Sequence, residues 1–174
     1  PREVSVETAA GLVDVAPPFS TTVLVTIAET AAAVIDLVDQ VSPDAVQLHG
    51  GLPPSELETV SDRCTTIAAY DVTDGDVIAA AAPHVDAILL DTLDTEGAGG
   101  TGRPHDWDLA RSRIDTLSVP VVLAGGLDPT NVGTAVAQTR PYGVDVATGV
   151  STDRDPARKD HDAIRTFVRH ARAE

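Results

Sequence analysis

Polar and small residues stand at the ends of apolar runs in this sequence, where they could do chemistry. His49 ends one such run, and Asp71 and Asp91 end two others. The pairs Gly125-Gly126 and Thr148-Gly149 end two more. In α/β proteins, ligands bind at the carboxyl ends of the strands. The sequence therefore predicts a ligand site built from these residues.

Two of the ionisable residues in this set, Asp91 and His49, suggest acid–base chemistry. Asp91 follows the apolar triplet Ile88-Leu89-Leu90, and a carboxyl group at such a strand end can act as a general acid. The alternative is that it caps the following loop. His49 precedes Gly50-Gly51, which leave room for a ligand to approach. The alternative for His49 is a structural hydrogen bond.

The glycine pairs suggest anion binding. Gly125-Gly126 and Thr148-Gly149 can each present unobstructed backbone N–H groups, and a following helix N-terminus would complete a phosphate cradle. Either pair alone could be only a turn, but two pairs on adjacent predicted strands favour phosphate. The run at 99–103, GGTGR, could be a lid, another anion site or a connector. It is not a P-loop, because no Gly-Lys-Ser/Thr follows.

Other reactive residue types are sparse. Cys64 is the only cysteine, which excludes an internal disulfide and a cysteine-based zinc site. It precedes a predicted strand, at the edge opposite the site, and is expected to be an inert thiol. The remaining histidines have no ligand spacing, so we predict no metal; they are His84, His105, His161 and His170.

These residues need a scaffold of alternating strands and helices. Strands are expected at 21–27, 45–48, 65–72, 86–92, 119–124 and 142–148. Helices are expected at 4–15, 28–40, 53–63, 74–82, 107–117, 128–138 and 159–173. Asp128 is the expected N-cap of the helix at 128–138, with Pro129 in its first turn.

Near-continuous apolar strands alternating with helices predict a parallel sheet covered on both faces, in one α/β domain over residues 1–174. An open doubly wound sheet and a (β/α)₈ TIM barrel are the two candidates. An open sheet carries its glycine fingerprint after the first strand, whereas barrels bind phosphate after strands seven and eight. The late glycines favour a barrel, with the six units numbered three to eight.

The charge balance limits the partners. There are 27 acidic and 12 basic residues, for a formal charge of −15, and no dense basic run predicts nucleic-acid binding. The densest basic stretch, 154–172, is interleaved with aspartates and is expected to be a solvated helix. No apolar run or leader-like start predicts membrane insertion or secretion, so a cytoplasmic location is expected. Such strong self-repulsion suggests a halophilic protein from a high-salt cytoplasm.

Five segments together resemble the phosphoribosylanthranilate isomerase family. They are VQLHG at 46–50, LLDT at 89–92, GGTG at 99–102 with DW at 106–107, LAGGLDPTNV at 123–132, and VDVATGV at 144–150 followed by RKDHD at 158–162. Their order and spacing agree with the family along the whole chain.

The resemblance implies a (β/α)₈ barrel enzyme of tryptophan biosynthesis that uses no cofactor. It implies an Amadori rearrangement of N-(5'-phosphoribosyl)anthranilate to 1-(2-carboxyphenylamino)-1-deoxyribulose 5-phosphate. Asp91 would be the general acid, Arg2 would hold the anthranilate carboxylate, and His49 would line the anthranilate side. The phosphate would bind Gly125, Gly126, Thr148 and Gly149. The partner is thus a phosphorylated small molecule, and the protein is expected to be a monomer or homodimer.

The sequence also departs from the family. The family's general base is a cysteine in a KICG motif on the first strand, and this sequence has no such motif. The family's glutamate after Gly-Val is Ser151 here. Compared with a barrel of about 200 residues, a strand–helix–strand segment of about 35–40 residues is absent. We therefore expect units three to eight here, with the missing segment and its cysteine in the natural protein.

Two alternative functions remain open. One is another phosphate-binding barrel enzyme, such as indole-3-glycerol-phosphate synthase. That enzyme needs a lysine and a glutamate at strand ends, and the only lysine, Lys159, is expected on the last helix. The other is a phosphosugar-binding module without catalysis.

Overall fold

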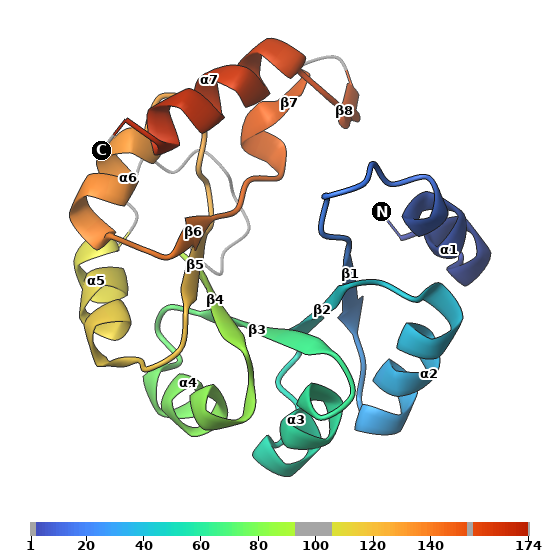
Figure 1. Ribbon diagram of the computed structural model, residues 1–174. Helices are drawn as coiled ribbons and strands as arrows, with labels where there is room; N and C mark the ends of the chain where they lie inside the picture. The colour runs from blue at the N-terminus through green and yellow to red at the C-terminus, as the bar shows by residue number, and fades with distance from the viewer. Residues whose placement is uncertain (1–2, 93–105, 153–154, 174) are drawn as a thin grey trace. The chain divides into compact units, whose positions relative to one another are not determined.

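The predicted strands pair side by side in chain order. The computed structural model describes residues 3–92, 106–152 and 155–173, and its large sheet has the order β1-β2-β3-β4-β5-β6 (Figure 1). These strands are β1 (Val23–Ile27), β2 (Ala45–His49), β3 (Thr65–Asp71), β4 (Ala87–Asp91), β5 (Val121–Ala124) and β6 (Gly143–Val144). The pairs β1–β2, β2–β3 and β5–β6 are parallel. Parallel neighbours require a crossover connection, which the intervening helices supply.

The helices alternate with the strands as the sequence predicts. They are α1 (Val6–Asp14), α2 (Ala31–Val41), α3 (Pro54–Ser61), α4 (Gly75–Ala81), α5 (Trp107–Thr116), α6 (Val132–Thr139) and α7 (His161–Ala171). Short 3₁₀ helices, η1 (Ala82–His84) and η2 (Thr148–Val150), follow α4 and β6. None of the described helices is long and apolar enough to cross a bilayer.

The chain forms two compact units. The first comprises Pro1–Tyr70 and Asp76–Ile88, and the second comprises Asp71–Gly75 and Leu89–Glu174. Each is described below by itself.

The core of the first unit lies between its strands and helices. Val46 of β2 is fully buried, as are Val34 of α2 and Val60 of α3. On β1, however, Val25 and Ile27 are 58% and 80% exposed. The prediction that both faces of the sheet are covered is therefore wrong at β1 within the described residues, because Val23, Val25 and Ile27 alternate along the strand and share one exposed face.

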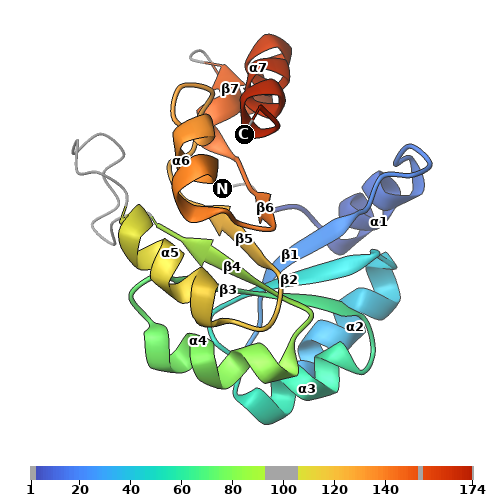
Figure 2. The same cartoon turned by 60° about the vertical axis from the view of Figure 1, so that its left-hand side comes forward.

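The core of the second unit is built from the helices that follow β4, β5 and β6. Figure 2 shows α5, α6 and α7, which pack in succession, α5 against α6 and α6 against α7. The buried residues of this core are Val72, Ala110, Leu123, Leu127, Val132, Ala135, Val150 and Phe167. Because Leu127 and Val150 belong to this cluster, the segments after β5 and β6 are anchored by apolar packing.

In the second unit, predicted boundaries shift and one hairpin forms that the sequence did not predict. Asp128 does not cap α6, which begins at Val132, because its carboxylate Oδ1 instead accepts from the backbone N–H and hydroxyl of Thr130, both at 2.6 Å. β6 has only two residues, because the chain turns into η2 at Thr148. A short antiparallel hairpin, β7 (Ser151–Thr152) and β8 (Asp155–Lys159), was not predicted.

Candidate active site

The turn after β5 has the backbone that its two glycines allow. Gly125 and Gly126 have φ values of 92° and 58°, in the left-handed region that other residues rarely adopt. Two side chains hold the carbonyl groups of this turn. The Thr92 hydroxyl lies 3.3 Å from the Gly125 carbonyl oxygen, and Asn131 Nδ2 donates to the Gly126 carbonyl at 3.0 Å. The turn is therefore fixed from outside by side-chain donors.

The second glycine segment lies directly against the first. A Cβ atom added to Gly149 would lie 2.0 Å from the Leu127 carbonyl oxygen and 3.0 Å from the Asp128 Cα. Only glycine permits this approach of η2 to the turn after β5. The structure thus brings together the two segments that the sequence suggested as a phosphate cradle.

Asp91 lies at the carboxyl end of β4, also in the second unit, and is half-buried. Its backbone carbonyl accepts from the Val72 N–H at 3.0 Å. The next residue, Thr92, is buried, and its N–H donates to the Ala124 carbonyl at 3.2 Å. Asp91 is thus joined through one peptide bond to a residue that contacts the end of β5.

The strand end in the first unit carries His49. Gln47 and His49 stand two positions apart on β2, so their side chains share one face. Gln47 Nε2 lies 2.8 Å from His49 Nε2. The structural alternative for His49, a hydrogen bond to a neighbour, is therefore realised within the first unit.

Two elements of the predicted site lie outside the described residues. They are Arg2 and the run at 99–103. The roles given to them stay predictions.

Cys64 has the environment of an inert thiol. It lies immediately before β3, and its Sγ is 3.8 Å from the Val60 carbonyl oxygen. Burial raises the pKa of the thiol, which disfavours the thiolate needed for base or nucleophilic chemistry. Among the residues described, no group of three or more potential ligands could hold a metal ion.

The region after β6 contains the only lysine. Lys159 ends β8, and its Nζ contacts the Ala147 carbonyl oxygen and lies 3.2 Å from Ser151 Oγ. The prediction that Lys159 lies on the last helix is therefore wrong, because Asp160 caps that helix and α7 starts at His161. A cavity of about 640 Å³ lies here, lined by Ser151, Thr152, Asp155, Arg158, Lys159, Asp160 and His161.

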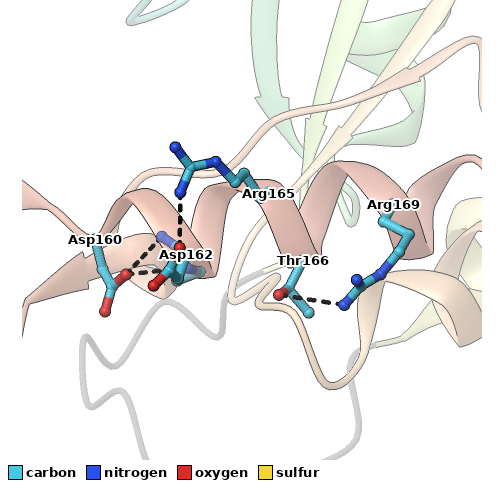
Figure 3. Close-up of polar contacts among 6 residues, drawn as sticks. Asp160, Asp162, Arg165, Thr166 and Arg169 are labelled. Carbon is cyan, nitrogen blue, oxygen red and sulfur yellow. Dashed lines mark hydrogen bonds and ion pairs between the residues drawn. The ribbon is translucent and has the colours of Figure 1, made fainter.

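The start of α7 explains the interleaved charges at 154–172. Asp160 accepts from the backbone N–H groups of Asp162 and Ala163 at 2.9 and 3.0 Å, and these bonds lower its pKa (Figure 3). Arg165 pairs with Asp162 at 2.7 Å on the exposed face. Residues 161–171 of this stretch therefore form a solvated helix that carries the Arg165–Asp162 ion pair, as the sequence predicts. The prediction is wrong for residues 155–159, which form β8 instead.

Two polar residues at the glycine turn were not singled out from the sequence. They are Thr92 and Asn131, which hold its carbonyl groups. Both belong to segments quoted for the family resemblance, LLDT and LAGGLDPTNV. No local pattern marks Thr92, because its hydroxyl contacts carbonyls 32 and 33 residues away in sequence. Asn131 acts on a carbonyl only five residues before it.

Known proteins resemble this chain along almost its whole length. Residues 1–170 match the family model of N-(5'phosphoribosyl)anthranilate (PRA) isomerase. A protein of Halobacterium salinarum named N-(5'-phosphoribosyl)anthranilate isomerase is 50% identical over 177 residues, covering 99% of this chain and 80% of that protein.

Solved structures agree with this result. The phosphoribosyl anthranilate isomerase of Thermotoga maritima has a TM-score of 0.84 and 34% identity, covering 99% of this chain and 83% of that one. Another structure of such an isomerase, in complex with reduced 1-(o-carboxyphenylamino)-1-deoxyribulose 5-phosphate, has a TM-score of 0.80 and 33% identity over 99% and 82% of the two chains. The predicted barrel-type α/β fold is confirmed, and the chain belongs to the N-(5'-phosphoribosyl)anthranilate isomerase family.

Proposed function

We propose that this protein catalyses the Amadori rearrangement of N-(5'-phosphoribosyl)anthranilate to 1-(2-carboxyphenylamino)-1-deoxyribulose 5-phosphate, a step of tryptophan biosynthesis. The match of residues 1–170 to the isomerase family carries the proposal. The reduced product seen in a related isomerase supports a phosphorylated, anthranilate-bearing substrate.

In this proposal Asp91 is the general acid. Protonation of the furanose ring oxygen lets the C1'–O bond break, and the nitrogen lone pair forms a C1'–N double bond. A base then removes the C2' proton to give an enolamine, which tautomerises to the ketone. No residue within the described ranges is assigned as that base, and burial raises the pKa of Cys64, which disfavours it.

The phosphate group is proposed to bind the backbone of Gly125, Gly126, Thr148 and Gly149. The close approach of Gly149 to Leu127 supports this, because it places both glycine segments beside each other. Arg2 is proposed to hold the anthranilate carboxylate, since a guanidinium binds a carboxylate through paired hydrogen bonds. His49 is proposed to line the anthranilate side.

The test is turnover by the full natural protein, with Asp91→Asn compared with Asp71→Asn. Asp71 also ends a strand, but its carboxylate accepts from the Thr73 N–H at 2.8 Å, a turn bond that asparagine can keep. Loss of a general acid lowers kcat by about 10²–10⁴-fold. We expect that loss for Asp91→Asn and a change below about threefold for Asp71→Asn.

A phosphosugar-binding module without catalysis is the second candidate. The paired glycine segments support it, since a backbone cradle of this kind could bind a phosphosugar without an acid or a base. Binding of the substrate without turnover by the full natural protein would support this candidate and exclude the isomerase.

We also propose that the protein works in a cytoplasm of high salt. The formal charge of −15 supports this, as does the similarity to a protein of the halophile Halobacterium salinarum. Counter-ions at molar concentration would screen the repulsion among its carboxylates.

A further inference from the structure

Thr92 lies between the two parts of the candidate site in the second unit. It follows Asp91 directly, and it is only 8% exposed. Its hydroxyl lies 3.0 Å from the Ala124 carbonyl oxygen and 3.3 Å from the Gly125 carbonyl oxygen. One buried hydroxyl proton is therefore shared between two successive carbonyl groups of the turn after β5.

Because peptide groups are planar, this contact also sets the direction of N–H groups on the other side of the turn. In a trans peptide, the carbonyl of one residue and the N–H of the next point in opposite directions, and the described residues contain no cis peptide bond. A hydroxyl that holds the Ala124 and Gly125 carbonyls thus directs the N–H groups of Gly125 and Gly126 away from itself. Those are the N–H groups proposed to bind phosphate.

This turn needs such support. Both glycines have positive φ, and glycine moves readily between positive and negative φ because it lacks a Cβ. Rotation of the Gly125–Gly126 peptide would reverse the direction of the Gly126 N–H. The Thr92 hydroxyl and Asn131 Nδ2 hold consecutive carbonyls, those of Gly125 and Gly126.

We propose that Thr92 is a positioning residue, whose shared hydroxyl hydrogen bond orients the phosphate-binding N–H groups of Gly125 and Gly126. It also connects that turn to Asp91, the adjacent proposed general acid. This inference rests on the proposed function, because it names a residue that the proposed phosphate site requires. Thr92 itself need not touch the substrate.

Thr92→Val tests this, because valine keeps the shape and removes the hydroxyl. Thr139→Val is the matched control: Thr139 is also buried in the second unit, and its hydroxyl also donates to a carbonyl, that of Ala135 at 2.8 Å. Thr92→Ser restores the hydroxyl, and Thr92→Ala gives a second hydroxyl-free variant if Thr92→Val folds poorly. Urea unfolding of each full-length variant establishes that it is folded.

The readouts are kcat, KM and the thermal stabilisation by inorganic phosphate, which does not depend on turnover. We expect Thr92→Val to raise KM and the phosphate dissociation constant about five- to tenfold, the effect of losing one buried hydrogen bond. The change in kcat should be smaller. Thr92→Ser and Thr139→Val should both stay within about twofold of the wild type.

Each result has one meaning. Equal phosphate binding by folded Thr92→Val and the wild type overturns the inference, and so does equal weakening in Thr139→Val. Absence of turnover in the wild type overturns the proposed function instead. In that case, stabilisation by phosphate still tests the role of Thr92.

Discussion

Two glycine pairs follow strands of the same sheet, one in each unit, and their backbones are nearly alike. Gly50 and Gly51 after β2 have φ values of 97° and 69°, and Gly125 and Gly126 after β5 have 92° and 58°. Their surroundings differ. A Cβ added to Gly51 would meet nothing within 4 Å, whereas the carbonyls of Gly125 and Gly126 are held by Thr92 and Asn131.

The comparison shows that two glycine pairs with similar backbones are held differently by their surroundings. Both pairs can present backbone N–H groups, because both lack a Cβ. Among the residues that the structure describes, side-chain donors lie on the carbonyls of the second pair, and a second glycine segment, at Gly149, packs against it within its own unit. In the proposed phosphate site, N–H groups that are oriented before a ligand arrives would reduce the ordering cost of binding.

The largest effect is expected from Gly149→Ala, which removes the contact that distinguishes the second pair. The new methyl would lie 2.0 Å from the Leu127 carbonyl oxygen, so η2 or the turn must move. We expect the free energy of unfolding to fall by about 3 kcal/mol and stabilisation by phosphate to be lost. Gly133→Ala is the control, because its methyl would meet the nearest atom at 3.6 Å. Urea unfolding measures the free energy of unfolding of both variants. An equal loss in Gly149→Ala and Gly133→Ala would contradict the close packing of η2 on the turn after β5.

Salt should raise the stability of the whole protein. The difference in stability between variants of the two glycine pairs should stay the same. Screening the net charge of −15 should raise the stability by about 2 kcal/mol between 0.1 and 3 M KCl, or roughly 4–8 °C in Tm. Thermal unfolding of the wild type and the glycine variants measures this. A Tm independent of KCl would count against the high-salt proposal.

Gly51→Ala and Gly125→Ala compare the two pairs directly. Each places alanine at positive φ, which costs about 1–2 kcal/mol, so both should lower stability similarly. Stabilisation by phosphate should weaken about tenfold or more in Gly125→Ala and less than about twofold in Gly51→Ala. Equal weakening of phosphate stabilisation in the two variants would contradict the proposed difference between the two glycine pairs.

The smallest effect concerns pH, with one aspartate in each unit. Backbone hydrogen bonds, from Thr22 to Asp44 and from Ala163 to Asp160, lower the pKa of each carboxyl group. A lowered folded-state pKa adds stability above the unfolded value, 3.8 for both, and that stability is lost as pH falls through the folded value. Between pH 6 and 3 the urea midpoint should therefore fall less in Asp44→Asn and Asp160→Asn than in the wild type.

Asp160 should also affect the site. Its N–H donates to the Val150 carbonyl at 2.8 Å, directly behind η2. We expect acidification to weaken phosphate stabilisation less in Asp160→Asn than in Asp44→Asn. The opposite order would show that the start of α7 does not support the glycine cradle.

Much of the fold could be predicted from residue types and spacing. Apolar strands that alternate with amphipathic helices require a parallel sheet, since each helix must cover it. The boundaries that shifted lie where side chains compete with the helix or strand pattern. Asp128 can cap a helix or close a short turn, and its bonds to Thr130 favoured the turn.

The sequence by itself determined that the glycine pairs and Asp91 lie at strand ends, and it determined the order of the strands and helices. These features follow from local backbone requirements and hydrophobic periodicity. Only the tertiary structure decided which glycine pair is held in place. Thr92 reaches the carbonyls of Ala124 and Gly125, more than thirty residues away in sequence, and Gly149 reaches Leu127. Such contacts depend on which strand ends become neighbours, and no local pattern encodes that choice.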